Sequence, residues 1–178
     1  MDLSSRVVDS LPRILASVEA PHPTIWRRLS RRIVYRLLNV GIGLSIPFTR
    51  RNGFRVLSTR HGYLRARVSL RGNRNHIGTM YAGAIFLLAE IPGGVIALLA
   101  FGREYFPILK DMSVTYKQPA KTDLTVEYCI APEDLDAIRR KADDDGKCDF
   151  TLEADLVDTT GAIVAHSVGH YQLRRRAR

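Results

Sequence analysis

The chain has 178 residues, of which 46% are hydrophobic and 25% charged, and these values argue against both a disordered chain and a polytopic membrane protein. The length suits one sizeable core and is short for two, so we expect a single domain with a peripheral extension. A formal net charge of +9 at pH 7 indicates an anionic partner, such as a nucleic acid, a membrane surface, an acidic carrier protein or a phosphorylated cofactor.

Residues 10 to about 40 carry apolar side chains at helical spacing, with a break at Pro21-His22-Pro23. The second part predicts an amphipathic helix that ends near Gly41 or Gly43. Its apolar stripe, beside an arginine-rich face, consists of Trp26, Leu29, Ile33, Leu37 and Val40. Such a stripe usually packs on the domain, and the alternatives are that the helix lies on an anionic membrane or docks an acidic partner.

In the next segments the apolar residues no longer follow helical spacing but alternate with polar residues. Residues 54–70 predict two strands joined by a hairpin turn at His61-Gly62, and a polar loop follows at 72–78. Residues 79–101 form the long helical candidate of this part of the chain. Its apolar stretch contains Glu90 and Pro92, so a buried core helix explains it better than a membrane span.

The remainder of the chain reads mainly as strands, at 108–117, 124–130, 150–157 and 163–173. A short surface helix is expected between Pro132 and Gly146, and a tight turn at Asp158-Thr159-Thr160-Gly161. The predicted order is a strand hairpin, one buried helix and a four-strand meander. This is an α+β arrangement in which an antiparallel sheet curls around one long central helix, the hotdog layout. We expect a helical extension over residues 1–52 and a hotdog domain over 53–178.

Cysteine and histidine usage gives further expectations. Cys129 and Cys148 form no C-x-x-C pair and follow no secretory signal, which favours reduced thiols and a cytoplasmic location. His166 and His170 would share one face of a strand, but two ligands alone make a poor metal site. We therefore expect neither a metal nor another cofactor.

The segment from Asn75 to Glu90 holds the residues for which chemistry can be argued. Glycines and a threonine open the predicted helix, whose first turn leaves backbone N–H groups unpaired and with positive dipole character. A carbonyl group placed there could have its developing oxyanion stabilised. The small residues Ala82 and Gly83 would let a substrate approach this backbone closely.

Glu90 lies eight residues beyond Ala82, which is roughly 12 Å along the same helix. A base and an oxyanion site this far apart cannot act on one carbonyl group, so the site is expected to straddle two subunits of a homodimer or a dimer of dimers. A lone carboxylate in an apolar helix is either functional or bonded to a nearby backbone group or arginine, and both interpretations stay open. Pro92 is expected to kink the helix beside Glu90 or to break it.

The run from Asn75 to Glu90 resembles the helix motif of the PaaI-like hotdog thioesterases, and especially of their DUF4442 branch. That motif is N-x-x-G-T-x-H-G-G, followed at a fixed distance by an acidic residue. The positions in register are Asn75, Gly78, Thr79, Gly83 and Glu90. Residues 111–121 also resemble the family's central strand and its Pro-Ala turn. The resemblance covers residues 54–173 and implies hydrolysis of an acyl thioester of CoA or a related acyl carrier.

The resemblance also implies roles for individual residues. Glu90 would be the general base or nucleophile, the amide at Ala82, beside Gly83, would polarise the thioester carbonyl, and Asn75 would orient the attacking water. The residues implied near the substrate are His76, Thr79 and Tyr81, together with Lys110, Lys117 and Lys121 close to the cofactor's phosphates. A surface loop histidine is the alternative for His76, and solvated strand-edge lysines are the alternative for the last three.

Two positions depart from the family pattern. Tyr81-Ala82 replaces the His-Gly pair, and Leu109 replaces a polar residue of the central strand. A backbone amide survives a change from glycine to alanine, but a tyrosine hydroxyl cannot titrate near neutrality as histidine can. The alternative to an enzyme is therefore a non-catalytic module that binds acyl thioesters or lipids and has a basic, membrane-associating helix. Few aromatic residues accompany the arginines, which argues against nucleic acid.

Overall fold

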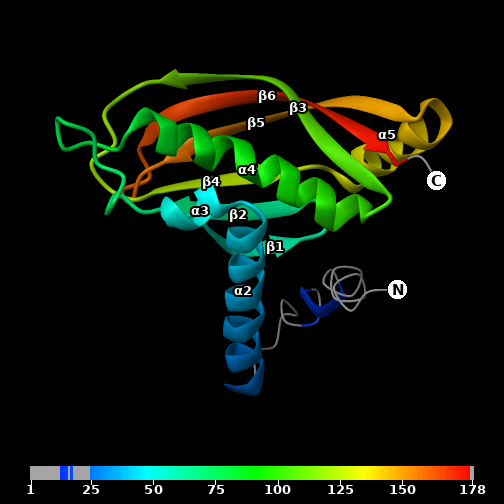
Figure 1. Ribbon diagram of the computed structural model, residues 1–178, viewed down its shortest axis with the longest axis horizontal. Helices are drawn as coiled ribbons and strands as arrows, with labels where there is room; N and C mark the ends of the chain where they lie inside the picture. Colours follow the sequence, from blue (N-terminus) through cyan, green and yellow to red (C-terminus); the bar gives the residue numbers. More distant parts are fainter. Residues whose placement is uncertain (1–12, 16, 18–24, 177–178) are drawn as a thin grey trace.

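The computed structural model describes residues 13–15, 17 and 25–176. In this part of the chain one antiparallel sheet, with strand order β1-β2-β4-β5-β6-β3, curls around a long helix, α4 (Figure 1). The strands are β1 (Arg55–Arg60), β2 (Tyr63–Val68), β3 (Tyr105–Tyr116), β4 (Leu124–Cys129), β5 (Lys147–Val157) and β6 (Ile163–Arg175). The helices are α2 (Ile25–Ser45), α3 (Pro47–Arg51), α4 (Ala82–Phe101) and α5 (Pro132–Asp145). The predicted hotdog fold is confirmed.

The hairpin of β1 and β2 is present where the alternation predicts it. The chain reverses at Gly62, whose φ is +72°, a left-handed conformation that glycine adopts without strain. A methyl group at Gly62 would also collide with the carbonyl oxygen of Ile130. Both constraints explain why the turn contains glycine.

The predicted four-strand meander after the helix is wrong. Strands β4, β5 and β6 do follow one another, but β3 pairs with β6 at the far edge of the sheet and β4 pairs with β2. Period-two alternation identifies strands and their faces but does not identify their partners. The consequence for the molecule is that β3 is an edge strand, and no described segment pairs with its outer side.

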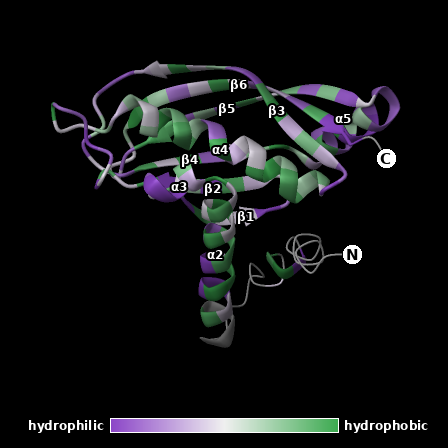
Figure 2. Cartoon of the chain, viewed as in Figure 1, coloured by the Kyte–Doolittle hydropathy of each residue, from purple (hydrophilic) through white to green (hydrophobic). Residues whose placement is uncertain are grey.

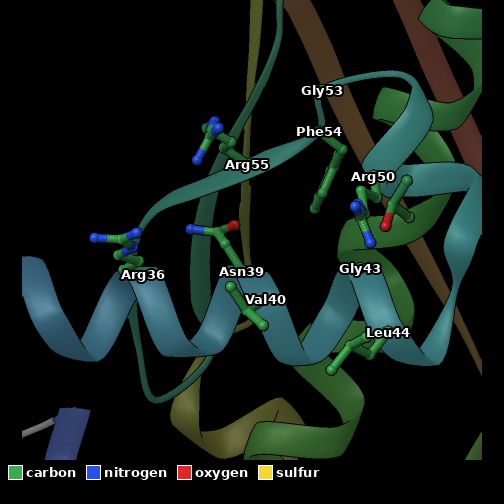
Figure 3. Close-up of a pocket in the computed structure, with 10 residues that line it drawn as sticks. Arg36, Asn39, Val40, Gly43, Leu44, Arg50, Gly53, Phe54 and Arg55 are labelled. Carbon is green, nitrogen blue, oxygen red and sulfur yellow. The ribbon is translucent and has the colours of Figure 1, made fainter.

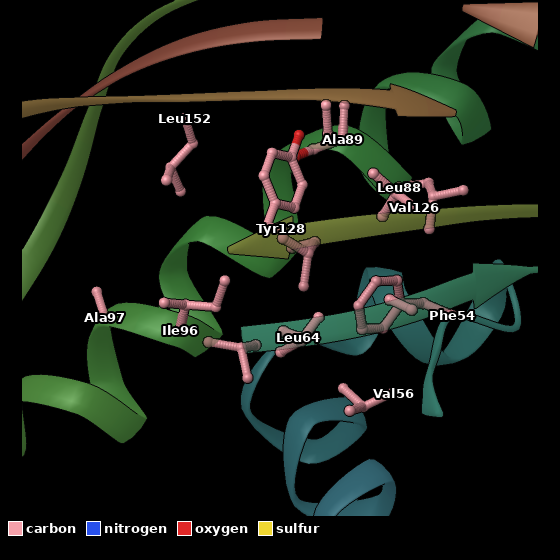
Figure 4. Close-up of a cluster of buried hydrophobic side chains, with 14 of the residues drawn as sticks. Phe54, Val56, Leu64, Leu88, Ala89, Ile96, Ala97, Val126, Tyr128 and Leu152 are labelled. Atoms are coloured by element: carbon pink, nitrogen blue, oxygen red, sulfur yellow. The ribbon is translucent and has the colours of Figure 1, made fainter. Parts of the chain in front are cut away.

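Helix α4 is the centre of the hydrophobic core. Leu88 and Ala89 are fully buried, and Figure 4 shows Leu88 near Val126 of β4 and Ala89 at the tip of Tyr128. Within the described chain α4 is the one helix long and apolar enough to cross a membrane, and 72% of its apolar window is buried inside the protein. This burial agrees with the prediction of a core helix. The helix also runs unbroken through Pro92.

The two smaller predicted features are confirmed. Helix α5 begins at Pro132 and ends before Gly146, whose φ of +74° gives the left-handed C-terminal cap. In the turn between β5 and β6, one carboxylate oxygen of Asp158 accepts the backbone N–H groups of Thr160 and Ala162. A glycine cap thus ends α5, and hydrogen bonds to a polar side chain close the turn between β5 and β6.

Helix α2 extends to Ser45, so Gly41 and Gly43 do not end it as predicted. Its C-terminal part lies beside β1, and the rest of the helix projects away from the sheet (Figure 1). Tyr35 attaches it there, because its hydroxyl accepts the N–H of Thr59 at 2.7 Å. The side chain of Asn39 bonds the N–H and carbonyl of Val56 at 2.7 and 3.0 Å. These bonds fix the C-terminal half of α2 against the hairpin.

The packed face of α2 is not the predicted one. The buried residues are Tyr35 and Leu38, whereas the predicted stripe is open to solvent, with exposed fractions of 52% at Leu29, 52% at Ile33, 64% at Leu37 and 51% at Val40. Figure 2 shows apolar and hydrophilic residues alternating along this projecting helix. The side chain of Trp26 lies outside the described residues, as does the break at Pro21-His22-Pro23. The boundary between residues 52 and 53 stays a prediction.

Candidate functional site

The loop that leads into α4 is closed by one asparagine and one threonine. The side-chain oxygen of Asn75 accepts the backbone N–H groups of Ile77 and Thr79, both at 3.1 Å. The side-chain amide of Asn75 donates to the hydroxyl of Thr79 at 2.9 Å. Most of the hydrogen-bonding capacity of Asn75 is therefore used to shape the loop, and one amide N–H remains for a ligand.

A second asparagine, Asn73, anchors the same loop to the rest of the fold. Its side-chain amide donates to the carbonyl oxygens of Asn52 and Ser69, both at 2.7 Å, and its own carbonyl accepts the N–H of Tyr81 at 2.7 Å. Sequence reasoning missed this residue, since an asparagine in a polar loop carries no signal of burial. Asn73 is nevertheless only 6% exposed, and it fixes where α4 begins.

The first turn of α4 presents free backbone donors. Tyr81 is the N-cap residue, has extended backbone angles and makes no side-chain capping bond. Its carbonyl accepts the N–H groups of Ala84 and Ile85 at 2.9 and 3.3 Å. Among the described residues, none accepts a hydrogen bond from the N–H of Ala82 or Gly83. Two unpaired donors at a positive helix end form a suitable place for a developing oxyanion.

Two tyrosines border these donors. The ring of Tyr81 lies against Gly83, in the space that a side chain at Gly83 would fill. The hydroxyl of Tyr116, at the end of β3, donates to the carbonyl oxygen of Ala82 at 3.4 Å. Burial and the neighbouring Tyr81 raise the pKa of Tyr116, so its hydroxyl stays protonated near neutral pH. Sequence reasoning did not select Tyr116, because its proximity to α4 comes from the curl of the sheet.

Glu90 lies on the exposed side of α4, between Phe86 and Leu98, which are 39% and 40% exposed. Its side chain is half-buried, and the burial raises the pKa of the carboxyl group above its ordinary value. Among the described residues the carboxylate has no hydrogen-bond or ion-pair partner. A structural partner, one of the two open interpretations, is thus not found among these residues. An unpaired carboxylate in apolar surroundings is a candidate for function.

The backbone around Glu90 is fixed by tyrosines of the sheet. The hydroxyl of Tyr171 donates to the carbonyl oxygen of Glu90 at 3.0 Å, and that of Tyr128 donates to the carbonyl oxygen of Ala89 at 2.9 Å. Figure 4 shows Tyr128 pointing to Ala89. These bonded carbonyls lie within the turn that precedes Pro92, which cannot donate a backbone hydrogen bond. The sheet therefore fixes where the backbone of α4 lies at Glu90.

The remaining predicted residues separate into two groups. His76 is exposed on the loop before α4, and Lys117 and Lys121 are exposed on the segment after β3. That segment reaches the start of α4, because the carbonyl of Ala120 accepts the N–H of Met80 at 2.9 Å. Lys110 is different, since it pairs with Asp149 at 3.0 Å on the sheet face that points away from α4.

The described residues contain no group of three His, Cys, Asp or Glu side chains that could hold a metal ion. His166 pairs with Asp155 at 2.9 Å, and His170 contacts the hydroxyl of Thr151 at 2.9 Å. Cys129 and Cys148 are both free, and only Cys148 is buried. The candidate site itself offers carboxylate, hydroxyl, amide and backbone groups.

Residues 35–172 match the model of the family named DUF4442, a domain of unknown function. A protein of unknown function from Pseudomonas aeruginosa, described as a probable thioesterase, is 39% identical, with a TM-score of 0.75 over 79% of this chain and 95% of the other. No curated protein matched the sequence.

More distant structures share the fold. A protein from Shewanella oneidensis, provisionally assigned as a thioesterase, has a TM-score of 0.67 at 22% identity, over 80% of this chain and 97% of the other. A thioesterase from Haemophilus influenzae has a TM-score of 0.63 at 12% identity, over 79% of this chain and 90% of the other. At these identities the likeness concerns the arrangement of sheet and helix. The family match begins inside α2, at residue 35.

Proposed function

This chain belongs to the DUF4442 family, and we propose that it hydrolyses the thioester bond of acyl-CoA or of a related acyl carrier. One observation carries the proposal: the carboxylate of Glu90 and the N–H groups of Ala82 and Gly83, all on α4, have no partner among the described residues. The likeness to the Pseudomonas protein described as a probable thioesterase supports the same reaction class.

The chemistry needs only these groups and water. Glu90 accepts a proton from water, which attacks the thioester carbonyl, and the carbonyl oxygen becomes an oxyanion bound by the N–H groups of Ala82 and Gly83. The tetrahedral intermediate collapses by breaking its C–S bond. The thiolate leaves and takes the proton from Glu90, so the products are a carboxylic acid and a thiol. Neither a metal nor another cofactor enters this proposal.

The distance between the two groups requires a second subunit. Glu90 and Ala82 lie roughly 12 Å apart along one helix, so the base of one protomer would act with the oxyanion donors of its partner. The edge strand β3 supports a homodimer, because its twelve residues leave one side unpaired within the described sheet. A long open edge is the place where a second copy can add its own strand.

The rest of the site would bind the substrate. Asn75 retains one amide N–H that can orient water, and Tyr81 and Tyr116 offer hydroxyl groups near the oxyanion donors. His76 and Thr79 border the same loop, and Lys117 and Lys121 supply positive charge for carrier phosphates. Lys110 is left out of this proposal because Asp149 already neutralises it. A cytoplasmic location stays a prediction.

Thiol release from short, medium, long and aromatic acyl-CoAs tests the proposal. We expect turnover with at least one class, and saturation with that substrate. A protein that binds acyl-CoA but releases no thiol from any of them would be the non-catalytic binding module instead. The replacement of the family's His-Gly pair by Tyr81-Ala82 makes that outcome the relevant alternative.

A further inference from the structure

Helix α2 carries an apolar stripe that no described residue covers. The side chain of Trp26 is not described and Leu44 continues the pattern, so from here the apolar stripe means Leu29, Ile33, Leu37, Val40 and Leu44. At about 100° per residue these positions fall within an arc of roughly 80°. Their exposed fractions run from 51% at Val40 to 69% at Leu44, and the packed residues Tyr35 and Leu38 lie on the opposite side of the helix. Within the described part of the chain, the stripe therefore has no packing role.

A cationic pocket continues from the C-terminal end of the stripe. This pocket, of about 300 Å³, lies between α2, α3 and the start of β1, and Val40 and Leu44 of the stripe belong to its wall. Its charged lining is Arg36, Arg50 and Arg55. Figure 3 shows Asn39 and Val40 between Arg36 and Arg50, with Arg55 across from them on β1.

None of these three arginines forms an ion pair with a residue that the structure describes. The wider sequence explains why: residues 20–89 contain 13 arginines and no aspartate or glutamate. Three guanidinium groups around one small pocket can bind a phosphate group through several charge-assisted hydrogen bonds. The pocket and the stripe are independent observations that meet at Val40 and Leu44.

The two features together select one occupant. A nucleic acid would satisfy the arginines but would leave the five aliphatic side chains of the stripe in water. A second copy of α2 would cover the stripe but would bring two sets of arginines together, with no carboxylate in this region to neutralise them. An anionic phospholipid surface provides hydrocarbon and phosphate at the same time.

We propose that α2 docks the protein on anionic phospholipid membranes. The apolar stripe enters the boundary between headgroups and acyl chains, and the Arg36–Arg50–Arg55 pocket holds a lipid phosphate. The pocket lining contains none of the candidate site residues at the start of α4 or at Glu90, so this surface is separate from the proposed thioesterase site. The inference holds whether or not the protein hydrolyses thioesters.

Flotation of the full chain with vesicles tests the proposal. We expect binding to vesicles of equal parts phosphatidylcholine and phosphatidylglycerol, little binding to pure phosphatidylcholine, and release as salt rises. Arg36→Gln/Arg50→Gln/Arg55→Gln should weaken binding roughly 100-fold. Leu37→Ser/Leu44→Ser, which keeps every charge, should weaken it more than tenfold.

A matched control removes three positive charges from α5 and the start of β5. Arg140→Gln/Lys141→Gln/Lys147→Gln should retain at least a third of the native binding, apart from the small effect of net charge. Circular dichroism establishes that each variant is folded. The proposal is overturned if the control triple weakens binding as much as the pocket triple, or if the Leu37/Leu44 variant binds vesicles like the native chain. It is also overturned if that variant instead changes the oligomer size, because a second copy would then occupy the stripe.

Discussion

The hydroxyl of Tyr171 donates a hydrogen bond to the backbone carbonyl oxygen of Glu90 at 3.0 Å, from a strand 81 residues later in the chain. Gly93 makes this contact possible, because any side chain there would collide with the tyrosine ring. The ring also stacks on Phe150, with 5.5 Å between the ring centroids. The backbone that carries the proposed catalytic carboxylate is thus fixed relative to the surrounding sheet.

Replacing Tyr171 by phenylalanine should remove this hydrogen bond and keep the stacking on Phe150. Because the carbonyl of Glu90 loses its sheet donor, we expect the free energy of unfolding to fall by about 1 kcal/mol. Urea denaturation measures the change. Tyr63→Phe is the control, since Tyr63 donates to Glu127 near the surface and should lose less than about 0.5 kcal/mol. Equal losses in the two variants would contradict the role given to Tyr171.

Adding a methyl group at two adjacent glycines should have opposite effects. Gly93→Ala forces the new Cβ into the ring of Tyr171, which should destabilise the protein by roughly 1–3 kcal/mol. Gly94→Ala meets no atom within 4 Å in the protomer, and its higher helix propensity should stabilise by up to about 1 kcal/mol. Thermal unfolding, with the oligomer size checked, distinguishes them. A Gly93→Ala protein as stable as the native one would show that Tyr171 does not lie where we describe it.

The stability of the protein should carry a pH signature of Glu90. Burial raises the pKa of this carboxyl group in the folded state above its ordinary value of 4.5, so the folded state binds more protons than the unfolded state between the two values. Stability therefore falls as pH rises through that window, and the penalty is fully present above it. Glu90→Gln removes the penalty, so it should raise the melting temperature at pH 7 and should have little effect near pH 4.

A control for this effect is Glu133→Gln, in the first turn of α5, where a negative charge is favourable. This variant should not raise the melting temperature at pH 7. If Glu90→Gln lowers the melting temperature at neutral pH instead, the carboxylate has a stabilising partner in the folded protein, and our description of it as unpaired is wrong.

A proline substitution in β3 tests the proposed dimer contact through this strand. The N–H of Lys117 bonds the carbonyl of Val164, and donors alternate along an antiparallel strand, so the N–H of Ser113 points to β6 and that of Val114 to the open edge. Val114→Pro should give a folded monomer without thioesterase activity, since an edge strand tolerates proline there. Light scattering after gel filtration measures the mass.

The matched variant is Ser113→Pro, which removes a donor from the β3–β6 ladder and should destabilise the protomer itself. If Val114→Pro remains a dimer, β3 is not the contact between subunits. If it becomes a monomer that still turns over substrate, a single protomer contains the whole site, and the shared arrangement of Glu90 and Ala82 is wrong.

Local patterns predicted much of this fold. The alternation of β5 and β6, the start of α5 at Pro132 and the turn at Gly62 all depend on residues close in sequence. The motif from Asn75 to Glu90 predicted the candidate site for the same reason. The helix and the loop before it form a continuous segment, so their residues are brought together by local geometry.

The parts that sequence reasoning missed depend on distant contacts. Alternation in β3 could not show that it pairs with β6, and a buried tyrosine such as Tyr128 gives no sign of which carbonyl it will reach. The stripe containing Leu37 has the pattern of a packed face, yet it is exposed. Hydrophobic periodicity identifies an apolar face of a helix. It does not say whether the same protomer, a second copy or a lipid covers that face.

The most direct test of the central claim is thiol release by Glu90→Gln, measured against the native protein on the best acyl-CoA substrate. With the dimer intact, we predict that kcat/KM falls by a factor of about 100 or more, while Glu133→Gln stays within about twofold. A Glu90→Gln protein that releases thiol at the native rate would contradict the assignment of this carboxylate as the base.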